Sequence, residues 1–189
     1  MHVMSETNIS TKLKLVDAAG QCMQKTSVEA LTVRQICQEA HMSRQSFYRC
    51  FKDKYDLINW YFDRILRESF HQMGNGRTVR ESLVLKFTYI KEEYTFFRAA
   101  FSTDTQNNLR DHDFDMIFAF YQNLIQEKSG KPVQDHVKDV LEMYCSASVY
   151  MTVKWVMHDL PSSPEELADT MISGMPLELE KVFEQCNLM

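Results

Sequence analysis

Apolar residues recur every three or four positions along most of the chain, which is the spacing of one face of a helix. The first stripe lies between Ser10 and Lys25, and two clearer stripes follow after residue 80. These two consist of Leu83, Phe87, Ile90, Tyr94, Phe97 and Phe101, and of Phe114, Ile117, Phe118, Tyr121, Leu124 and Ile125. The pattern predicts an all-α fold.

Three N-cap signals fall close together in the first third of the chain. Thr32 and Gln35 have the spacing of a capping box, and Ser43 and Asp53 are further N-cap residues. Such closely spaced starts predict short helices that meet at steep angles. The predicted helices are residues 33–40, residues 44–51, and a longer one from 53 to about 70.

Residues 71–77, with two glycines and an asparagine, are the best candidate for a linker. We therefore expect two domains, residues 8–70 and 78–189. In the second, Ser129-Gly130 predicts a helix end, a long helix follows Pro132 to about His158, and a last short helix follows Pro176. Ser163-Pro164-Glu165-Glu166 is the strongest helix start in the chain.

Composition excludes several classes of protein. With 5 Gly and 4 Pro, the chain has too few turn residues for an all-β fold. No apolar run approaches the ~18 residues of a membrane span and no secretory signal is visible, so we expect a cytoplasmic protein without membrane contact. The 5 Cys are odd in number and scattered, which disfavours disulfides and zinc.

The sequence shows no catalytic, cofactor or metal motif, and we expect none of the three functions. Asp111-His112-Asp113 resembles a metal or acid–base cluster. Adjacent residues on a helix point in different directions, however, so we interpret it as a solvated, capping stretch.

The net charge of −5 hides an asymmetry between the two parts of the chain. Residues 1–70 carry ten basic and eight acidic residues, whereas the remainder carries eleven and eighteen. Between Thr32 and Lys54 five basic residues face two acidic ones. A small basic segment joined to an acidic body is compatible with a local nucleic-acid site.

Two short helices joined by a turn at residues 32–51 have the layout of a helix-turn-helix, whose second helix enters the major groove of DNA. That second helix begins with side chains that can read base edges, namely Arg44, Gln45 and Ser46. Apolar Phe47 and Phe51 lie on the opposite face. The residues expected to contact phosphates are Thr32, Ser43, Tyr48, Arg49 and Lys54. A plain helical hairpin with solvated polar residues is the alternative.

The segment TVRQICQEAHMSRQSFYRCFKDKYDL resembles the DNA-binding segment of the TetR family of transcriptional regulators. The family pattern T-x-x-x-I-A-x-x-A-G-V-S-x-x-x-x-Y-x-x-F-x-x-K-x-x-L is matched in register by Thr32, Ile36, Ala40, Ser43, Tyr48, Phe51, Lys54 and Leu57. The resemblance covers about 60 residues and implies a three-helix DNA-binding domain followed by a larger helical domain for dimerisation and ligand binding. It also implies that Thr32, Tyr48 and Lys54 hold phosphates.

The chain departs from the family pattern at a few positions. Cys37 replaces an alanine, and Thr26-Ser27 stands where a glycine is usual. His41 replaces the glycine of the turn, where we expect a left-handed backbone at some cost in energy. Residues 150–168 are also loosely similar to regulators of the dihydroxyacetone-kinase activator type, which leaves both repression and activation open.

The C-terminal helices are rich in aromatic residues. These are candidates for a pocket that takes a small apolar or aromatic effector, with ordinary core packing as the alternative. The candidate pocket residues are Phe97, Phe101, Phe118, Tyr121, Tyr144 and Trp155.

Residues 147–153 carry no charge, and such a helix must be covered on all sides. We expect a homodimer whose interface includes Val149, Met151, Leu167 and Met171, because one helix-turn-helix reads too few bases to select a site in a genome. The leading hypothesis is a dimeric, ligand-responsive repressor, or else activator, bound to an inverted-repeat operator. The alternative is a co-regulator of the same fold that acts through a protein partner.

Overall fold

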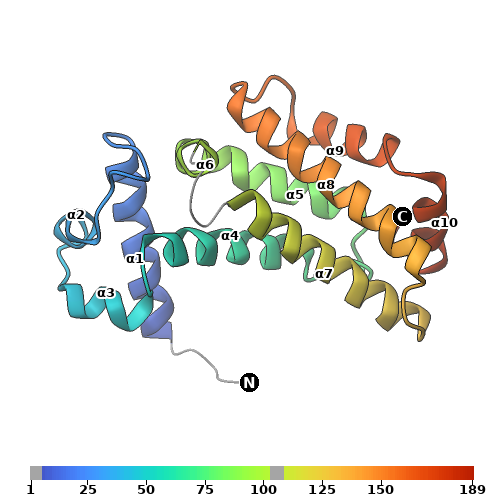
Figure 1. Ribbon diagram of the computed structural model, residues 1–189, viewed down its shortest axis with the longest axis horizontal. Coiled ribbons are helices and arrows are strands. Elements are labelled where there is room, and N and C mark those ends of the chain that lie inside the picture. The colour runs from blue at the N-terminus through green and yellow to red at the C-terminus, as the bar shows by residue number, and fades with distance from the viewer. Residues whose placement is uncertain (1–5, 103–108) are drawn as a thin grey trace. The chain divides into compact units, whose positions relative to one another are not determined.

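The computed structural model describes residues 6–102 and 109–189, and within these ranges the chain forms ten α-helices and no strands (Figure 1). The predicted all-α fold is confirmed. The helices are α1 (Glu6–Met23), α2 (Val33–Glu39), α3 (Arg44–Cys50), α4 (Lys54–Phe70), α5 (Val79–Glu92), α6 (Tyr94–Phe101), α7 (Leu109–Ser129), α8 (Asp135–Met157), α9 (Pro164–Ser173) and α10 (Leu177–Gln185). Among the described helices, none combines the length and the apolar character that crossing a membrane requires.

The chain divides into two compact units. The first comprises Met1–Phe62 and Tyr94–Leu109, and the second comprises Asp63–Glu93 and Arg110–Met189. Helix α4 contributes to both, with residues 54–62 in the first unit and 63–70 in the second. Helix α6 belongs to the first unit although α5 and α7, its neighbours in sequence, lie in the second.

The core of the first unit forms where α1 packs against α2, α3 and α6. Phe62 of α4 is fully buried, and its ring centroid lies 5.8 Å from that of Phe97 and 6.2 Å from that of Phe101. Phe47 of α3 is also fully buried. The packing of α2 and α3 against α1 and the burial of Phe47 stabilise these two helices, which by themselves would be too short to be stable.

The second unit is built on long helices. Helix α9 packs along α5, and α10 contacts α8. The ring centroid of Phe87 lies 5.7 Å from that of Trp155, and the ring of Tyr121 stacks on that of Phe183 at 5.3 Å. Aromatic pairs of this kind tie distant segments together and dominate core energetics.

The predicted helix starts are confirmed by their hydrogen bonds. Thr32 and Ser163 form complete capping boxes, and the Ser43 side chain accepts from the Ser46 amide. Asp53 Oδ1 accepts from two amides in the first turn of α4 at 2.9 Å. Gly130 has a φ of +68 directly after α7, as its position at a helix end requires.

The apolar stripe from Leu83 to Phe101 differs from the structure in one respect. It is divided between α5 and α6 by Glu93, so that its first three members lie in the second unit and its last three in the first. A break of a single residue leaves the spacing of apolar residues unchanged, so the periodicity alone gives no sign of it.

Candidate nucleic-acid interface

The turn between α2 and α3 is set by its caps and by one unusual backbone conformation. The Thr32 side chain and the Gln35 side chain cap α2 reciprocally. The chain then reverses through His41, whose φ of +52 places a non-glycine residue in the left-handed region, as expected from the sequence. Ser43 starts α3 directly afterwards. The result is the helix–turn–helix geometry in which α3 can enter a groove.

Helix α3 has one buried and one exposed face. Phe47 packs into the core with no exposed surface. Arg44, Gln45 and Arg49 are exposed, and the Tyr48 side chain is 52% exposed. Since α3 contains no acidic residue, its exposed surface carries two guanidinium groups, a carboxamide and a phenol. These groups suit contacts with base edges and phosphates.

The polar side chains of α3 are connected to one another. Arg44 lies against the Tyr48 ring, 6.0 Å from its centroid, and the hydrogen bond to Tyr48 raises the pKa of Arg44. Arg49 donates to Ser46 Oγ at 3.2 Å, and Ser46 Oγ lies 3.0 Å from Ser43 Oγ. These contacts hold the arginines in defined positions before any ligand binds, which lowers the entropy cost of binding.

Lys54 has a role that the sequence did not indicate. Its Nζ donates to the carbonyl oxygens of Glu29 at 2.7 Å and Leu31 at 2.8 Å, which lie in the turn before α2. Partial burial lowers the pKa of Lys54. The side chain therefore anchors the helix-turn-helix to the start of α4. Only the third hydrogen of this ammonium is left over for a phosphate.

In the second unit, Asp111 is exposed to solvent, whereas His112 is half-buried and Asp113 is buried. Asp113 is completely buried, and its carboxylate accepts from Lys86 Nζ at 3.1 and 3.2 Å. His112 Nε2 lies 2.5 Å from Asp63 Oδ1. The interpretation as a solvated stretch was therefore wrong for Asp113 and His112, whose partners come from other helices, 27 and 49 residues away in the sequence. No group of three metal ligands occurs in the described part of the chain.

The six aromatic residues predicted to line a pocket are placed mainly in core contacts. Phe97 and Phe101 are buried in the first unit, whereas Tyr121, Tyr144 and Trp155 are buried in the second. Trp155 Nε1 donates to the Ser162 carbonyl oxygen at 2.9 Å. Phe118 is half-buried and stacks on Phe114. The six predicted pocket residues are thus divided between the two units.

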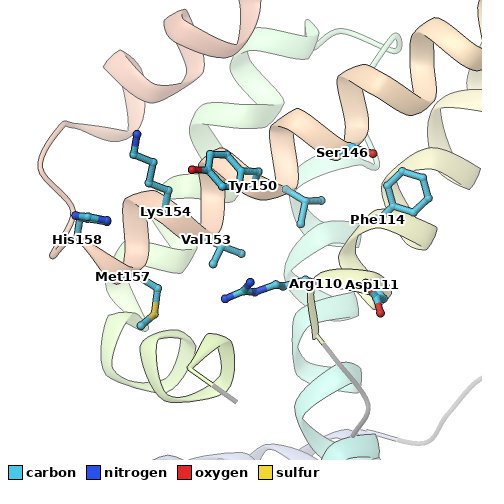
Figure 2. A pocket seen from close by; sticks show the side chains of 10 residues that line it. Arg110, Asp111, Phe114, Ser146, Tyr150, Val153, Lys154, Met157 and His158 are labelled. Carbon is cyan, nitrogen blue, oxygen red and sulfur yellow. The ribbon is translucent and has the colours of Figure 1, made fainter. Parts of the chain in front are cut away.

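A cavity of about 430 Å³ lies between α7 and α8 in the second unit, and Figure 2 shows the side chains that line it. Arg110 and Phe114 belong to its α7 wall, and Val149 and Val153 to its α8 wall. Of the six predicted pocket residues, none lines it. A charged residue at the start of a helix gives no sign in the sequence that it lines a pocket. The sequence therefore did not indicate Arg110 as a lining residue.

The predicted interface residues differ in their exposure. Val149, Leu167 and Met171 are buried in the chain's own core, and Met151 is half-buried. The outward face of α8 instead carries Ala147 and Tyr150 of this uncharged region and Met143 one turn before it, and Met143 and Tyr150 are 67% and 65% exposed. Any partner that covers α8 must contact these three residues.

Comparison with known proteins links both parts of the chain to one family. Residues 15–60 match the family model described as "Bacterial regulatory proteins, tetR family". Residues 77–175, just over half of the chain, match a TetR C-terminal model described as "Transcriptional regulator C-terminal region".

The HTH-type dhaKLM operon transcriptional activator DhaS of Lactococcus lactis subsp. lactis is 26% identical to this chain over 97 residues, 51% of this chain and 52% of DhaS. The match thus spans about half the length of this curated relative. A solved structure of the dihydroxyacetone kinase operon activator DhaS is 21% identical, with a TM-score of 0.66 and 92% of this chain and 98% of that chain covered. For the fatty acid degradation regulator FadR from Bacillus halodurans the identity is 17%, the TM-score 0.60, and the coverage 86% and 93%. These structures share the fold.

Proposed function

The chain belongs to the TetR family of bacterial transcriptional regulators, and on that premise we propose that it acts as a homodimer that recognises an inverted-repeat operator. The observation that carries the proposal is α3, which buries Phe47 and exposes Arg44, Gln45, Tyr48 and Arg49 on its other side. In this proposal Arg44 and Gln45 read base edges in the major groove, because each can form two hydrogen bonds to one base.

The phosphate contacts come from residues around the recognition helix. Tyr48 and Arg49 reach the backbone beside the groove, and Thr32 and Ser43 present helix N-termini to it. Ser46 is held between Ser43 and Arg49, so its contribution is to orient Arg49 as well as to contact the DNA. Lys54 supports the same contacts mainly by holding the turn before α2.

The homodimer rests on the exposed face of α8. Met143, Ala147 and Tyr150 are spaced four and three residues apart and share one side of the helix. Two large apolar side chains exposed by about two thirds are costly in water, and a second copy of the chain would cover them. Two copies related by a two-fold axis present two α3 helices, which match half-sites one or more helical turns apart.

Control of the dimer by an effector that binds the second unit completes the proposal. The DhaS relative is named as an activator, whereas a regulator bound across a promoter represses by excluding polymerase. Transcription in vitro from a promoter to which the protein is bound shows whether it represses or activates: fewer transcripts indicate repression, and more indicate activation.

Selection of bound fragments from a genomic DNA library tests the proposal. Recovery of an inverted repeat supports it, especially if the affinity falls steeply between 50 and 200 mM salt. Recovery of unrelated fragments with no shared motif would favour the alternative, a co-regulator that contacts a protein partner through the acidic first turn of α9, which carries Glu165 and Glu166.

A further inference from the structure

The cavity between α7 and α8 combines apolar walls with positive charge. Figure 2 shows Arg110 extending from the start of α7 into the cavity towards Val153 and Met157. Lys154 and His158 lie further along the α8 side of the cavity. Asp111 is the one carboxylate in the lining and is exposed to solvent. Arg110 and Lys154 thus bring permanent positive charge to the lining, which favours an anionic ligand.

The remaining lining is suited to a hydrocarbon or aromatic body. Val149 and Val153 are almost fully buried, and Phe114 and Met157 are half-buried. A guanidinium next to such side chains binds a carboxylate more strongly than it would in open water, because the low local polarity strengthens the charged hydrogen bond. The volume of about 430 Å³ lies within the usual range for sites of small organic molecules.

The α7 wall is held in place by two ion pairs to other helices. His112 and Asp113 lie between the cavity residues Arg110 and Phe114 in sequence, and they bind Asp63 of α4 and Lys86 of α5. The first two turns of α7 are therefore fixed by side chains other than those that line the cavity. Because this wall is already ordered, little conformational entropy is lost when a ligand binds.

We infer that this cavity binds a small organic anion with a compact apolar body, such as an aryl carboxylate, whose acid group pairs with Arg110. As the effector site of the regulator proposed above, it rests on that function. It differs from the sequence-based expectation of an apolar effector among Phe97, Phe101 and their aromatic neighbours, because the charged Arg110 is the group that orients the ligand.

Calorimetric titration of the full-length protein with three matched probes tests the inference. The probes are 2-naphthoate, which is an anion, 2-naphthamide, which is its neutral analogue, and 2-naphthylmethylammonium, which is a cation. The expected order of affinity is anion, neutral compound, cation. The anion should lose on the order of tenfold or more in affinity in Arg110→Gln, the factor expected for one charge-assisted hydrogen bond. Lys154→Gln, at an exposed position, should cause a smaller loss without affecting folding.

Arg67→Gln is the matched control. Arg67 borders a smaller and almost wholly apolar cavity of about 110 Å³ between α4 and α7, which also has a cation at its edge. We expect Arg67→Gln to bind 2-naphthoate like the unaltered protein. Loss of binding in Arg67→Gln but not in Arg110→Gln would move the site to that smaller cavity and overturn the inference.

Results of two other kinds, in the titration and in sedimentation, would also overturn it. One is equal binding of all three probes, or no binding at millimolar concentration. The other is a change in the oligomeric state of Arg110→Gln in sedimentation, which would place Arg110 itself in the subunit interface and not only Tyr150, the lining residue shared with the proposed dimer face. A gel shift that measures DNA binding separately distinguishes failure of this inference from failure of the proposed function. If the protein binds its operator but none of the probes, this inference alone is refuted. If it binds 2-naphthoate but no DNA, the proposed function is refuted.

Discussion

The Nζ atom of Lys54 lies 2.8 Å from the carbonyl oxygen of Leu31, so the first residue of α4 is tied to the residue directly before the N-cap of α2. A second bond to the carbonyl oxygen of Glu29 strengthens this connection. The position of the helix-turn-helix thus depends on a side chain that comes after it in the sequence. The same lysine lies close to the surface that we propose to face DNA.

Replacing Lys54 by methionine should lower the free energy of unfolding by about 1–2 kcal/mol, because two hydrogen bonds from a charged donor are lost at a partly exposed site. Urea unfolding followed by circular dichroism measures the change. Lys52→Met, at the exposed neighbouring lysine, should leave stability nearly unchanged. If Lys54→Met weakened DNA binding without any loss of stability, the lysine would act through phosphate alone.

His41→Gly should stabilise the protein by up to ~1 kcal/mol, because His41 has a φ of +52 and glycine reaches the left-handed region without a steric penalty. Ala40→Gly is the matched control in the same turn. Ala40 has a φ of −73, so glycine there should destabilise by about 0.5–1 kcal/mol. Thermal unfolding of both variants gives the comparison, and a destabilised His41→Gly would show that the imidazole makes a contact worth more than the strain.

The pair of His112 and Asp63 predicts a dependence of stability on pH. The hydrogen bond to Asp63, more than any other contact, raises the pKa of His112 above its ordinary value of 6.5. Its contribution is therefore complete below about pH 6.5 and is lost as the pH rises through the higher pKa of the folded state. The thermal midpoint should fall between pH 6 and pH 8 by more in the unaltered protein than in His112→Gln. His158→Gln, at an exposed histidine, should keep the full slope.

Met143→Asp should weaken the homodimer, because it places a charge on the exposed apolar face of α8. Sedimentation at micromolar concentration should show a shift towards monomer, together with weaker operator binding. Leu177→Asp alters a side chain of α10 that is 65% exposed, and it should leave the dimer intact. A dimer that is disrupted by Leu177→Asp but not by Met143→Asp would place the interface on α10.

The local features of the DNA-binding segment could be predicted from the sequence because they depend on near neighbours. A capping box joins residues three apart, and Thr32, Ser43 and Ser163 all cap as expected. The left-handed backbone at His41 was expected because the family pattern has a glycine at this position. Helix ends and turns of this kind are decided within a few residues, where sequence patterns are informative.

The contacts that shape the second unit could not be predicted in this way. Asp113 looks like a surface residue in the sequence, and only the arrival of Lys86 from α5 makes its burial tolerable. The cavity is likewise formed by Arg110 and Val153, which come from two helices, and no spacing rule joins them. Leu167 and Met171 share a helix face as predicted, but the sequence does not tell whether α5 or a second copy covers that face.

The most direct test of the proposed function compares Arg44→Ala with Arg49→Ala in DNA binding, measured by fluorescence anisotropy on the selected site and on a scrambled site at several salt concentrations. The account predicts that Arg44→Ala loses about 1–3 kcal/mol on the selected site and relaxes the preference for it, whereas Arg49→Ala weakens both sites alike and lowers the salt slope by about one per contact. Equal binding of both sites by the unaltered protein, with no steep dependence on salt, would contradict sequence-specific recognition through α3.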